Sequence, residues 1–269
     1  MEIEEIRRTV LDTVASIAPE TDLRGIASDQ PLRQQIDLDS MDWLNVIAGV
    51  HERLSIGMPE SDYGRLATLD SIVAYLASRQ AAHPTEPSTA KALAPGSLPC
   101  ALHVVNGTPV TVRPIRPEDS PLEADFVRHL SAETRYQRFM VTVSELPARK
   151  LRYFTDVDQV RHVALVATVD RSGQQVIVGV VRYIVDPTGN SCEFAVAVDD
   201  AWQGCGLAGI LMHALIDVAR ARGLGTMEGV VLATNTRMLK FTHQLGFTQQ
   251  RDPEDRDTVR VVRSLRAAA

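Results

Sequence analysis

The sequence predicts two domains, a small all-α bundle followed by an α/β domain with a mixed sheet. Three observations predict this division. Residues 1–80 show helical periodicity only, residues 81–100 are rich in Pro, Ala, Ser and Thr, and residues 101–269 alternate between strand and helix patterns. A chain of 269 residues is also long for one compact domain and comfortable for two.

The first domain is predicted to be a bundle of four helical segments. These are residues 2–17, a helix that begins after Ser40 and ends before Gly57, a short turn at residues 63–66, and residues 69–79. The apolar face of the second helix is expected to consist of Met41, Leu44, Ile47, Ala48 and Leu54. The last helix is expected to bury Leu69, Ile72, Val73 and Leu76.

The formal net charge of −6 is concentrated in this first domain. Residues 1–80 hold 14 Asp and Glu against seven Arg, a balance of −7, so the remaining residues together carry +1. Such an acidic domain is unsuited to nucleic acid and favours a basic protein partner. The sequence shows no signal peptide and no uncharged run long enough to span a bilayer, so we expect a cytoplasmic protein without a membrane partner.

Residues 81–100 are predicted to form a semi-extended linker, because prolines recur along them. The second domain, residues 101–269, follows. Its expected strands are residues 104–115, 163–169, 175–185, 191–198 and 226–232, with further strand from Phe247 onward. Its expected helices are two within residues 121–140 on either side of Ser131, then residues 147–154, 206–222 and 236–245.

One strand-turn-helix segment, from Glu193 to Gly209, says most about the chemistry. An alternating strand runs into a polar turn and then into an amphipathic helix, whose start is lined by the small residues Gly204, Gly206 and Ala208. The first N–H groups of a helix lack intrahelical acceptors and lie at the positive end of its dipole, so a diphosphate can bind there. By itself, such a turn is more often ordinary turn structure than a ligand site.

The segment resembles the acyl-CoA-binding motif of GNAT acyltransferases, Q/R-x-x-G-x-G/A, with Gln203, Gly206 and Ala208 at its defined positions. Residues 103–265 resemble this family, and the bacterial protein-lysine acetyltransferases in particular. The other matching residues are 113–119, 130–131, 135–139, 235–238 and 245–247. The resemblance implies a mixed, mostly antiparallel sheet flanked by helices. It also implies an enzyme that transfers an acyl group from acetyl-CoA, or another acyl-CoA, to an amine such as a protein lysine.

The resemblance further implies which residues bind the cofactor. They are Val198, Gln203, Gly204, Cys205, Gly206, Leu207, Ala208, Gly209 and Asn235. An ordinary helix N-cap is the alternative interpretation of Asn235, and both roles are compatible. Cys205 is interpreted as a small filler of the turn, because direct transfer is the rule in the family.

Glu193 is the predicted catalytic base. A protonated amine cannot attack a thioester, so a base must remove its proton directly or through a water. The apolar residues Phe194, Val196 and Val198 on the same strand are expected to desolvate the carboxylate and so raise its pKa. A solvated strand residue is the alternative interpretation of Glu193. No general acid is assigned, because Thr242 stands where many GNAT enzymes have a tyrosine.

Two further features complete the expected chemistry of this domain. The three cysteines, Cys100, Cys192 and Cys205, are odd in number and lack metal-ligand spacing, so we expect reduced thiols and no metal. Residues 135–138 place two arginines and a tyrosine near the expected substrate groove, although a solvated helix face is the more common explanation of such a run.

The first domain resembles an acyl carrier protein over residues 3–76. The resemblance rests on residues 36–42, 56–60 and 69–72. It implies that Ser40 carries 4'-phosphopantetheine, and a phosphodiester is electrostatically well placed at a helix N-terminus. It also implies that Asp37, Asp39 and Asp42 form the acidic surface recognised by a phosphopantetheinyl transferase and by acyl-loading enzymes.

The carrier resemblance is incomplete at two positions. Asp37-Leu38 replaces the usual glycine that precedes the Asp-Ser pair, and Asn45 replaces a usual glutamate, so partner choice is expected to differ from that of a fatty-acid carrier. An ordinary N-cap is the alternative interpretation of Ser40.

Together the domains leave three functions open. The first is an N-acyltransferase that uses acyl-CoA or its own carrier thioester. The second is a synthase of N-acylated small molecules, and the third is a carrier module whose GNAT domain only senses acyl-CoA. The acyl group, the acceptor and the oligomeric state are not determined by the sequence.

Overall fold

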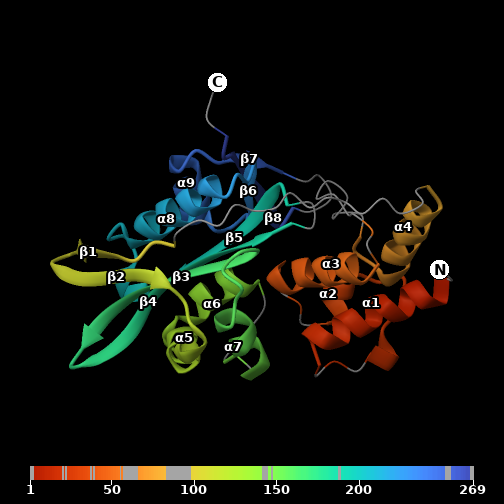
Figure 1. Cartoon of the computed structure of the whole chain (residues 1–269), viewed down its shortest axis with the longest axis horizontal. Coiled ribbons are helices and arrows are strands. Elements are labelled where there is room, and N and C mark those ends of the chain that lie inside the picture. Colours follow the sequence, from red (N-terminus) through yellow and green to blue (C-terminus); the bar gives the residue numbers. More distant parts are fainter. Residues whose placement is uncertain are drawn as a thin grey trace. The chain divides into compact units, whose positions relative to one another are not determined.

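The structure is a computed structural model, and it shows two compact units (Figure 1). One unit consists of helices, and the other is built around a sheet. The residues whose structure is described are 3–19, 21, 23–36, 38, 40–54, 56, 66–82, 98–140, 145–146, 148–186, 189–251 and 256–266. No helix among these residues is long and apolar enough to cross a membrane.

In the part of the helical unit that the structure describes, four α-helices and a 3₁₀ turn pack around one core. The elements are α1 (Ile3–Ile17), η1 (Leu23–Gly25), α2 (Leu32–Gln35), α3 (Ser40–Leu54) and α4 (Leu69–Ala82). The core takes Ile6, Val10 and Val14 from α1 and all four expected residues of α4. The apolar periodicity of the sequence therefore placed the first and last helices correctly.

Two features of the helical unit differ from the prediction. The short helix α2 was missed, because four residues are too few to show periodicity. The buried face of α3 contains Ile47 as expected, but also Trp43, Val46 and Val50. Of the predicted linker, the structure describes only Ala81–Ala82 and Leu98–Cys100. Of the predicted turn at residues 63–66, it describes only Leu66. The proposed domain boundaries remain predictions.

The second unit contains one sheet with strand order β1-β2-β3-β4-β5-β6-β8-β7. The strands are β1 (Ala101–Val105), β2 (Thr108–Pro114), β3 (His162–Arg171), β4 (Gln174–Val185), β5 (Ser191–Val198), β6 (Thr226–Leu232), β7 (Thr248–Gln250) and β8 (Thr258–Ser264). Neighbours pair antiparallel except β5 and β6, which are parallel. The sheet is therefore mixed and mostly antiparallel, as expected.

The single strand predicted over residues 104–115 is wrong, because the chain turns back within it. Asn106 and Gly107 adopt positive φ angles of 49° and 77° and connect β1 to β2. An Asn-Gly pair is the preferred sequence for a two-residue hairpin turn with this backbone conformation. The sequence thus carried the signal, and the alternating pattern on either side concealed it.

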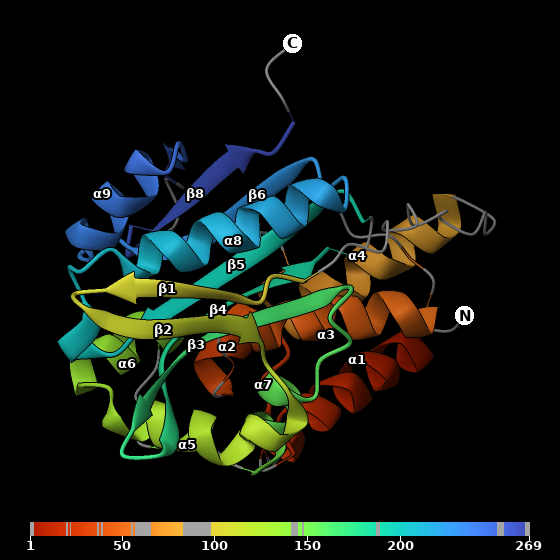
Figure 2. The same ribbon diagram turned by 60° about the vertical axis from the view of Figure 1, so that its left-hand side comes forward.

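Helices cover both faces of this sheet (Figure 2). The helical elements are η3 (Pro117–Asp119), α5 (Ser120–His129), α6 (Ala132–Phe139), α7 (Ala148–Thr155), η4 (Asp200–Trp202), α8 (Leu207–Ala221) and α9 (Thr236–Gln244). Helices α8 and α9 pack in one apolar cluster, whereas α5, α6 and α7 pack in another on the opposite face. Because successive side chains of a strand point to opposite faces, each strand contributes to both clusters: Val181 faces the α8 side and Val180 faces the α5 side.

Candidate active site

The parallel strands β5 and β6 stay paired over only part of their length. Within the described residues they pair at three positions, the last of which joins Glu193 to Glu228. Beyond it, residues 194–198 of β5 continue to pair with β4, and residues 229–232 of β6 continue to pair with β8. The two facing strand edges are therefore free of each other next to Glu193, which leaves backbone groups that an extended ligand can hydrogen-bond.

A phenylalanine ring lies where the strands part. An ideal Cβ placed on Gly229 would lie 2.7 Å from Cε1 of Phe194, so only glycine fits opposite this ring. Phe194 also contacts Phe247, with ring centroids 5.1 Å apart. The packing of these aromatic rings occupies the α8 face of the sheet at the point of separation.

The N-terminus of α8 lies at the end of the turn that follows β5. Its N-cap is Gly206, whose φ is 89°, and Gly204 has a φ of 78°. Neither Gly206 nor Gly209 would place a Cβ within 4 Å of a described atom, so both face open space. A helix N-terminus with free amides and room beside it can accept a diphosphate, and binding of the cofactor there stays a prediction from the sequence.

A hydrogen-bond network holds the turn between β5 and α8. Gln203 Nε2 donates to the carbonyl oxygen of Val198 and to the hydroxyl of Thr134, both at 3.2 Å. Asp200 accepts from the backbone N–H and the hydroxyl of Ser131, both at 2.8 Å, and from Thr134 at 2.7 Å. Gln203 thus positions the turn, and its neighbour Asp200 ties it to the N-terminus of α6.

These bonds affect the ionisation of Asp200. Burial alone would raise the pKa of its carboxyl group, but the hydrogen bonds from Ser131 and Thr134 outweigh burial, so the pKa is lowered. Asp200 was not among the predicted site residues. The signal in the sequence was its position three residues before Gln203, combined with Ser131 at the start of a predicted helix.

The N-terminal end of α9 approaches the same turn. Asn235 accepts from the backbone N–H of Met238 at 3.0 Å, so its N-cap interpretation is confirmed. Arg237 donates to Gln203 Oε1 at 2.7 Å, and its Nη2 would lie 3.5 Å from a Cβ on Gly204. The exposed Arg237 is thus a cation beside the helix N-terminus, which the sequence reasoning missed because it assigned only Asn235 there.

Glu193 is half-buried and lies on the face opposite to α8. Strand alternation places Phe194, Val196 and Val198 on the α8 face, so these residues do not share a face with the carboxylate. Ala195 and Ala197 share the Glu193 face instead. The register partner of Glu193, Glu228, is buried and ion-paired with Arg260.

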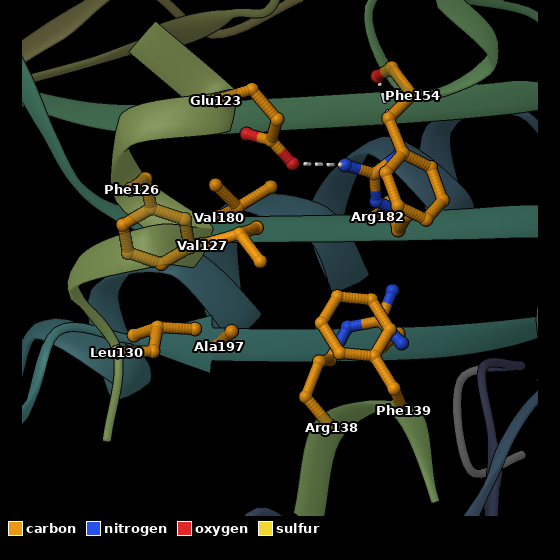
Figure 3. Close-up of a pocket in the computed structure, with 11 residues that line it drawn as sticks. Glu123, Phe126, Val127, Leu130, Arg138, Phe139, Phe154, Val180, Arg182 and Ala197 are labelled. Carbon is orange, nitrogen blue, oxygen red and sulfur yellow. Dashed lines mark hydrogen bonds and ion pairs between the residues drawn. The ribbon is translucent and has the colours of Figure 1, made fainter. Parts of the chain in front are cut away.

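A small pocket with a mostly apolar lining lies on this face beneath α5, α6 and α7 (Figure 3). Ala195 and Ala197 line it, together with Glu123, Arg138, Phe154 and Arg182. Arg182 Nη2 pairs with Glu123 Oε1 at 3.0 Å, and both side chains are at most 3% exposed. The face of α6 was expected to be solvated; Tyr136 is indeed exposed, but Arg138 turns onto the rings of Phe139 and Phe154.

Two remaining predictions concern protons and thiols. Thr242 is fully buried, and its hydroxyl donates to the carbonyl oxygen of Leu239 at 3.0 Å, so it is a core residue. The Cys205 thiol donates to the carbonyl oxygen of Trp202 at 2.7 Å, within the turn. Cys192 is buried, and Cys100 is exposed. Each cysteine is a free thiol.

Comparison with known proteins identifies the second unit. Residues 125–247 match the model of the acetyltransferase (GNAT) family. Acetyltransferase PA5475 of Pseudomonas aeruginosa is 39% identical over 150 residues, which cover 56% of this chain and 81% of the relative. The chain belongs to the GNAT acetyltransferase family. It is therefore an N-acyltransferase, and the pantetheine thioester of acyl-CoA is its expected type of donor.

Further relatives agree with this GNAT assignment. Acetyltransferase Pat of Mycolicibacterium smegmatis is 30% identical over 149 residues, which cover 55% of this chain and 44% of that protein. The crystal structure of the GNAT domain of S. lividans PAT matches with a TM-score of 0.56 and 31% identity, and the match covers 61% of this chain and 96% of that domain. The similarity to the protein-acetyltransferase branch that the sequence predicted is therefore confirmed.

The helical unit is matched separately. Residues 8–76 match the model of the phosphopantetheine attachment site. Ser40 lies inside this range and is the first residue of α3. Asp42 is only 4% exposed, so the expectation that it contributes to an acidic surface is wrong. Asp37 and Asp39, the other two members of that predicted surface, lie outside the described residues.

Proposed function

We propose that this enzyme transfers an acetyl group from acetyl-CoA to a primary amine, such as a protein lysine, with Glu193 as the general base. The observation that carries the proposal is the separation of β5 from β6 beside Glu193, on the same strand that leads into the N-terminus of α8. A pantetheine arm can then extend along residues 194–198, while its diphosphate binds at the turn.

In this proposal the cofactor-binding residues act mainly through their backbone. The amides of Leu207, Ala208 and Gly209 belong to the first turn of α8 and bind the diphosphate, because they lack intrahelical acceptors. Gln203, Gly204, Cys205 and Gly206 form the turn, and Val198 and Asn235 flank it. Arg237 adds a positive charge on the exposed side.

The reaction requires the amine nitrogen to lose two protons, the first of them before the attack. The carboxylate of Glu193 takes a proton from the incoming ammonium group, directly or through a water, and the neutral amine attacks the thioester carbonyl carbon. The new C–N bond forms as the C–S bond breaks, the nitrogen releases its second proton to solvent, and the leaving thiolate takes a proton from solvent. Glu193 is half-buried, and a carboxylate can accept the proton of the ammonium group.

The test compares Glu193→Gln with a matched control, Glu118→Gln, which alters an exposed glutamate of η3. With acetyl-CoA and a lysine-bearing protein, Glu193→Gln should lower kcat about 10²-fold or more and remove the acidic limb of the pH–rate profile. The control should retain both. Unchanged activity in Glu193→Gln would exclude Glu193 as the base.

We further propose that Ser40 carries 4'-phosphopantetheine and that its thioester is an alternative donor. Carrier and CoA thioesters share the pantetheine arm, and attachment to the same chain raises the effective concentration of the donor. Co-expression with a phosphopantetheinyl transferase should add the mass of one phosphopantetheine, and Ser40→Ala should abolish this adduct. After acyl loading, loss of the acyl group upon amine addition would support carrier-linked transfer, and its retention would limit the donor to CoA.

A second candidate is a synthase of N-acylated small molecules. The observation that favours it is the phosphopantetheine attachment domain, since carriers deliver acyl groups to dedicated partners. Acceptor competition separates the two functions: preference for a small amine over a lysine-bearing protein would favour the synthase. Absence of turnover with every amine would favour acyl-CoA sensing.

A further inference from the structure

Two glutamates lie side by side at the point where β5 and β6 stop pairing. Glu193 and Glu228 are register partners on these adjacent parallel strands, and adjacent strands lie about 4.8 Å apart. Both side chains lie on the face opposite to α8, because the next residue of one strand, Phe194, and the preceding residue of the other, Met227, belong to the apolar cluster of α8. Like charges on neighbouring strands repel each other, so this arrangement favours a bound cation.

Arg260 of β8 supplies one cation to Glu228 and leaves part of the carboxylate unused. Its Nε donates to Glu228 Oε2 at 2.8 Å, and its Nη2 donates to the same oxygen. The Glu228 side chain is only 9% exposed, yet in the described part of the chain no hydrogen bond ends on its other oxygen, Oε1. Buried carboxylate oxygens normally accept hydrogen bonds. Oε1 can therefore accept a bond from a donor group on a ligand.

Arg260 is placed so that another cation can replace it. Its side chain is 41% exposed, whereas the carboxylate that it pairs with is buried. Its register partner across the sheet is Val230, so it reaches Glu228 from two positions along the strand. Its Nη1 also donates to the exposed Gln250 of β7 at 3.3 Å. Exchange of this arginine would leave no guanidinium buried without a counter-charge, which is the costly outcome when a buried ion pair is broken.

The face that carries the two glutamates is also the face from which an acceptor can approach. On the α8 face, the ring of Phe194 fills the space beside Gly229 where the strands part. On the other face, the apolar cluster of α5, α6 and α7 includes residues of β3, β4 and β5 but no described residue of β6 or β8. The polar side chains of Glu228 and Arg260 therefore form the continuation of this face beyond Glu193.

We propose that Glu228 binds the ammonium group of the acceptor amine beside Glu193, in exchange for Arg260. The inference rests on the proposed acyltransferase function and identifies the group that holds its acceptor. An ammonium group has three N–H donors, so it can donate one to Glu228 Oε1 while Glu193 takes the proton that the amine loses. Glu228 acts as an acceptor-binding residue and keeps its charge. The acceptor class is thus a primary amine that arrives as a cation, such as a lysine side chain.

The test measures the affinity for the ammonium group without turnover. The enzyme is saturated with CoA, which has no acetyl group to transfer, and is titrated calorimetrically with Nα-acetyl-lysine amide or with Nα-acetyl-norleucine amide, which lacks the ammonium group. Wild type should prefer the lysine compound. Glu228→Gln should lower the lysine-to-norleucine affinity ratio about tenfold or more, the scale of one charge-assisted hydrogen bond, and Arg260→Gln should raise the ratio because the competing cation is gone.

The opposite directions of these two effects separate binding from a structural role, because either variant breaks the same ion pair. The controls are Glu118→Gln and Arg128→Gln, which alter an exposed glutamate and an exposed arginine and should leave the ratio unchanged. If Glu228→Gln does not fold, the double variant with Arg260→Gln removes both charges, and its ratio should lie about tenfold or more below that of Arg260→Gln alone.

Three results would overturn the inference: no preference for the lysine compound in wild type, ratios that do not differ among the variants, or ratios that move in the same direction. The proposed function is tested separately by acetyl-CoA turnover in Glu193→Gln. If turnover were unchanged there while the ratios moved as expected, Glu193 would be excluded as the base and the acceptor site at Glu228 would stand. If turnover fell there while the ratios stayed constant, only the acceptor site would be lost.

Discussion

Asp200 joins the turn before α8 to the start of α6 by accepting two hydrogen bonds of 2.8 Å from Ser131. The residues are 69 positions apart in the sequence. The same carboxylate also accepts from Thr134, which in turn accepts from Gln203. The position of this turn, which we propose binds the cofactor, is therefore set by a helix from the other face of the sheet.

Asp200→Ala should raise the KM for acetyl-CoA about tenfold, because the turn loses its anchor and the backbone donors are displaced from the diphosphate. The kcat, which measures turnover by the saturated enzyme, should change less. Steady-state kinetics measures both constants. The control is Asp217→Ala, an exposed aspartate of α8, which should resemble wild type. A KM equal to wild type in Asp200→Ala would show that the turn is held without this network.

Gly209→Ala separates binding from stability. The new Cβ meets no described atom within 4 Å, so the fold should accept it. Alanine in a helix should raise the free energy of unfolding by about 0.4–1 kcal/mol. The methyl group would nevertheless occupy the space proposed for the diphosphate, so the affinity for acetyl-CoA should fall. Calorimetric titration together with urea unfolding measures both; unchanged affinity would place the diphosphate elsewhere.

Gly229→Ala should have the opposite effect on stability. Its Cβ would lie 2.7 Å from the ring of Phe194, and such overpacking costs about 1–3 kcal/mol. Part of that loss should be recovered in the double variant with Phe194→Leu, where the smaller side chain makes room. Chemical denaturation of the single and double variants measures the coupling. Additive losses would show that the two residues do not compete for this space.

Arg237→Gln should weaken the binding of acyl donors that carry the nucleotide diphosphate more than the binding of donors that lack it. The guanidinium lies beside Gly204 and the N-terminus of α8, where only the diphosphate would reach it. The KM for acetyl-CoA should rise and become less sensitive to salt, whereas the KM for acetyl-pantetheine should not change. Gln203→Ala, which removes the acceptor of Arg237, separates loss of charge from loss of position. Equal effects on both donors would exclude a phosphate contact.

The free energy of unfolding should fall as the pH drops below about 4, partly because of Asp119. Burial would raise the pKa of this carboxyl group, but hydrogen bonds from Arg113 and the backbone of Arg116, with the charge of Arg113, outweigh burial and lower it. A lowered folded pKa means that the stabilisation is present above the unfolded pKa and is lost as the pH falls toward the folded value.

Asp119→Asn tests this assignment. This substitution should lower the free energy of unfolding by about 3–5 kcal/mol at neutral pH, because the nearly buried Arg113 loses its charged partner at 2.6 Å. It should also make the free energy of unfolding fall less steeply at acid pH. Trp202 fluorescence during urea unfolding, in a Trp43→Phe background, reports on the sheet unit alone, since Trp43 belongs to the helical core. If the free energy of unfolding of the variant fell as steeply at acid pH as that of wild type, the loss would be due to other carboxyl groups.

The sequence by itself determined the elements and the family of this protein. Helical periodicity placed α1 and α4, strand alternation placed β5 and β6 at their observed bounds, and the turn residues of 203–209 identified the α8 N-terminus. These signals are local, because periodicity and turn chemistry depend on residues near one another in the chain. The roles of Glu193 and Ser40 remain predictions of that resemblance.

Only the tertiary structure decided how distant residues meet. It brought Ser131 to Asp200 and Arg237 to Gln203. The opposite faces of Glu193 and Phe194, by contrast, follow from strand alternation. The tertiary structure also turned Arg138 inward beside Arg182, although helix α6 reads as a solvated surface in the sequence. Charge compensation and packing depend on which elements lie together across the sheet, and no local pattern encodes that.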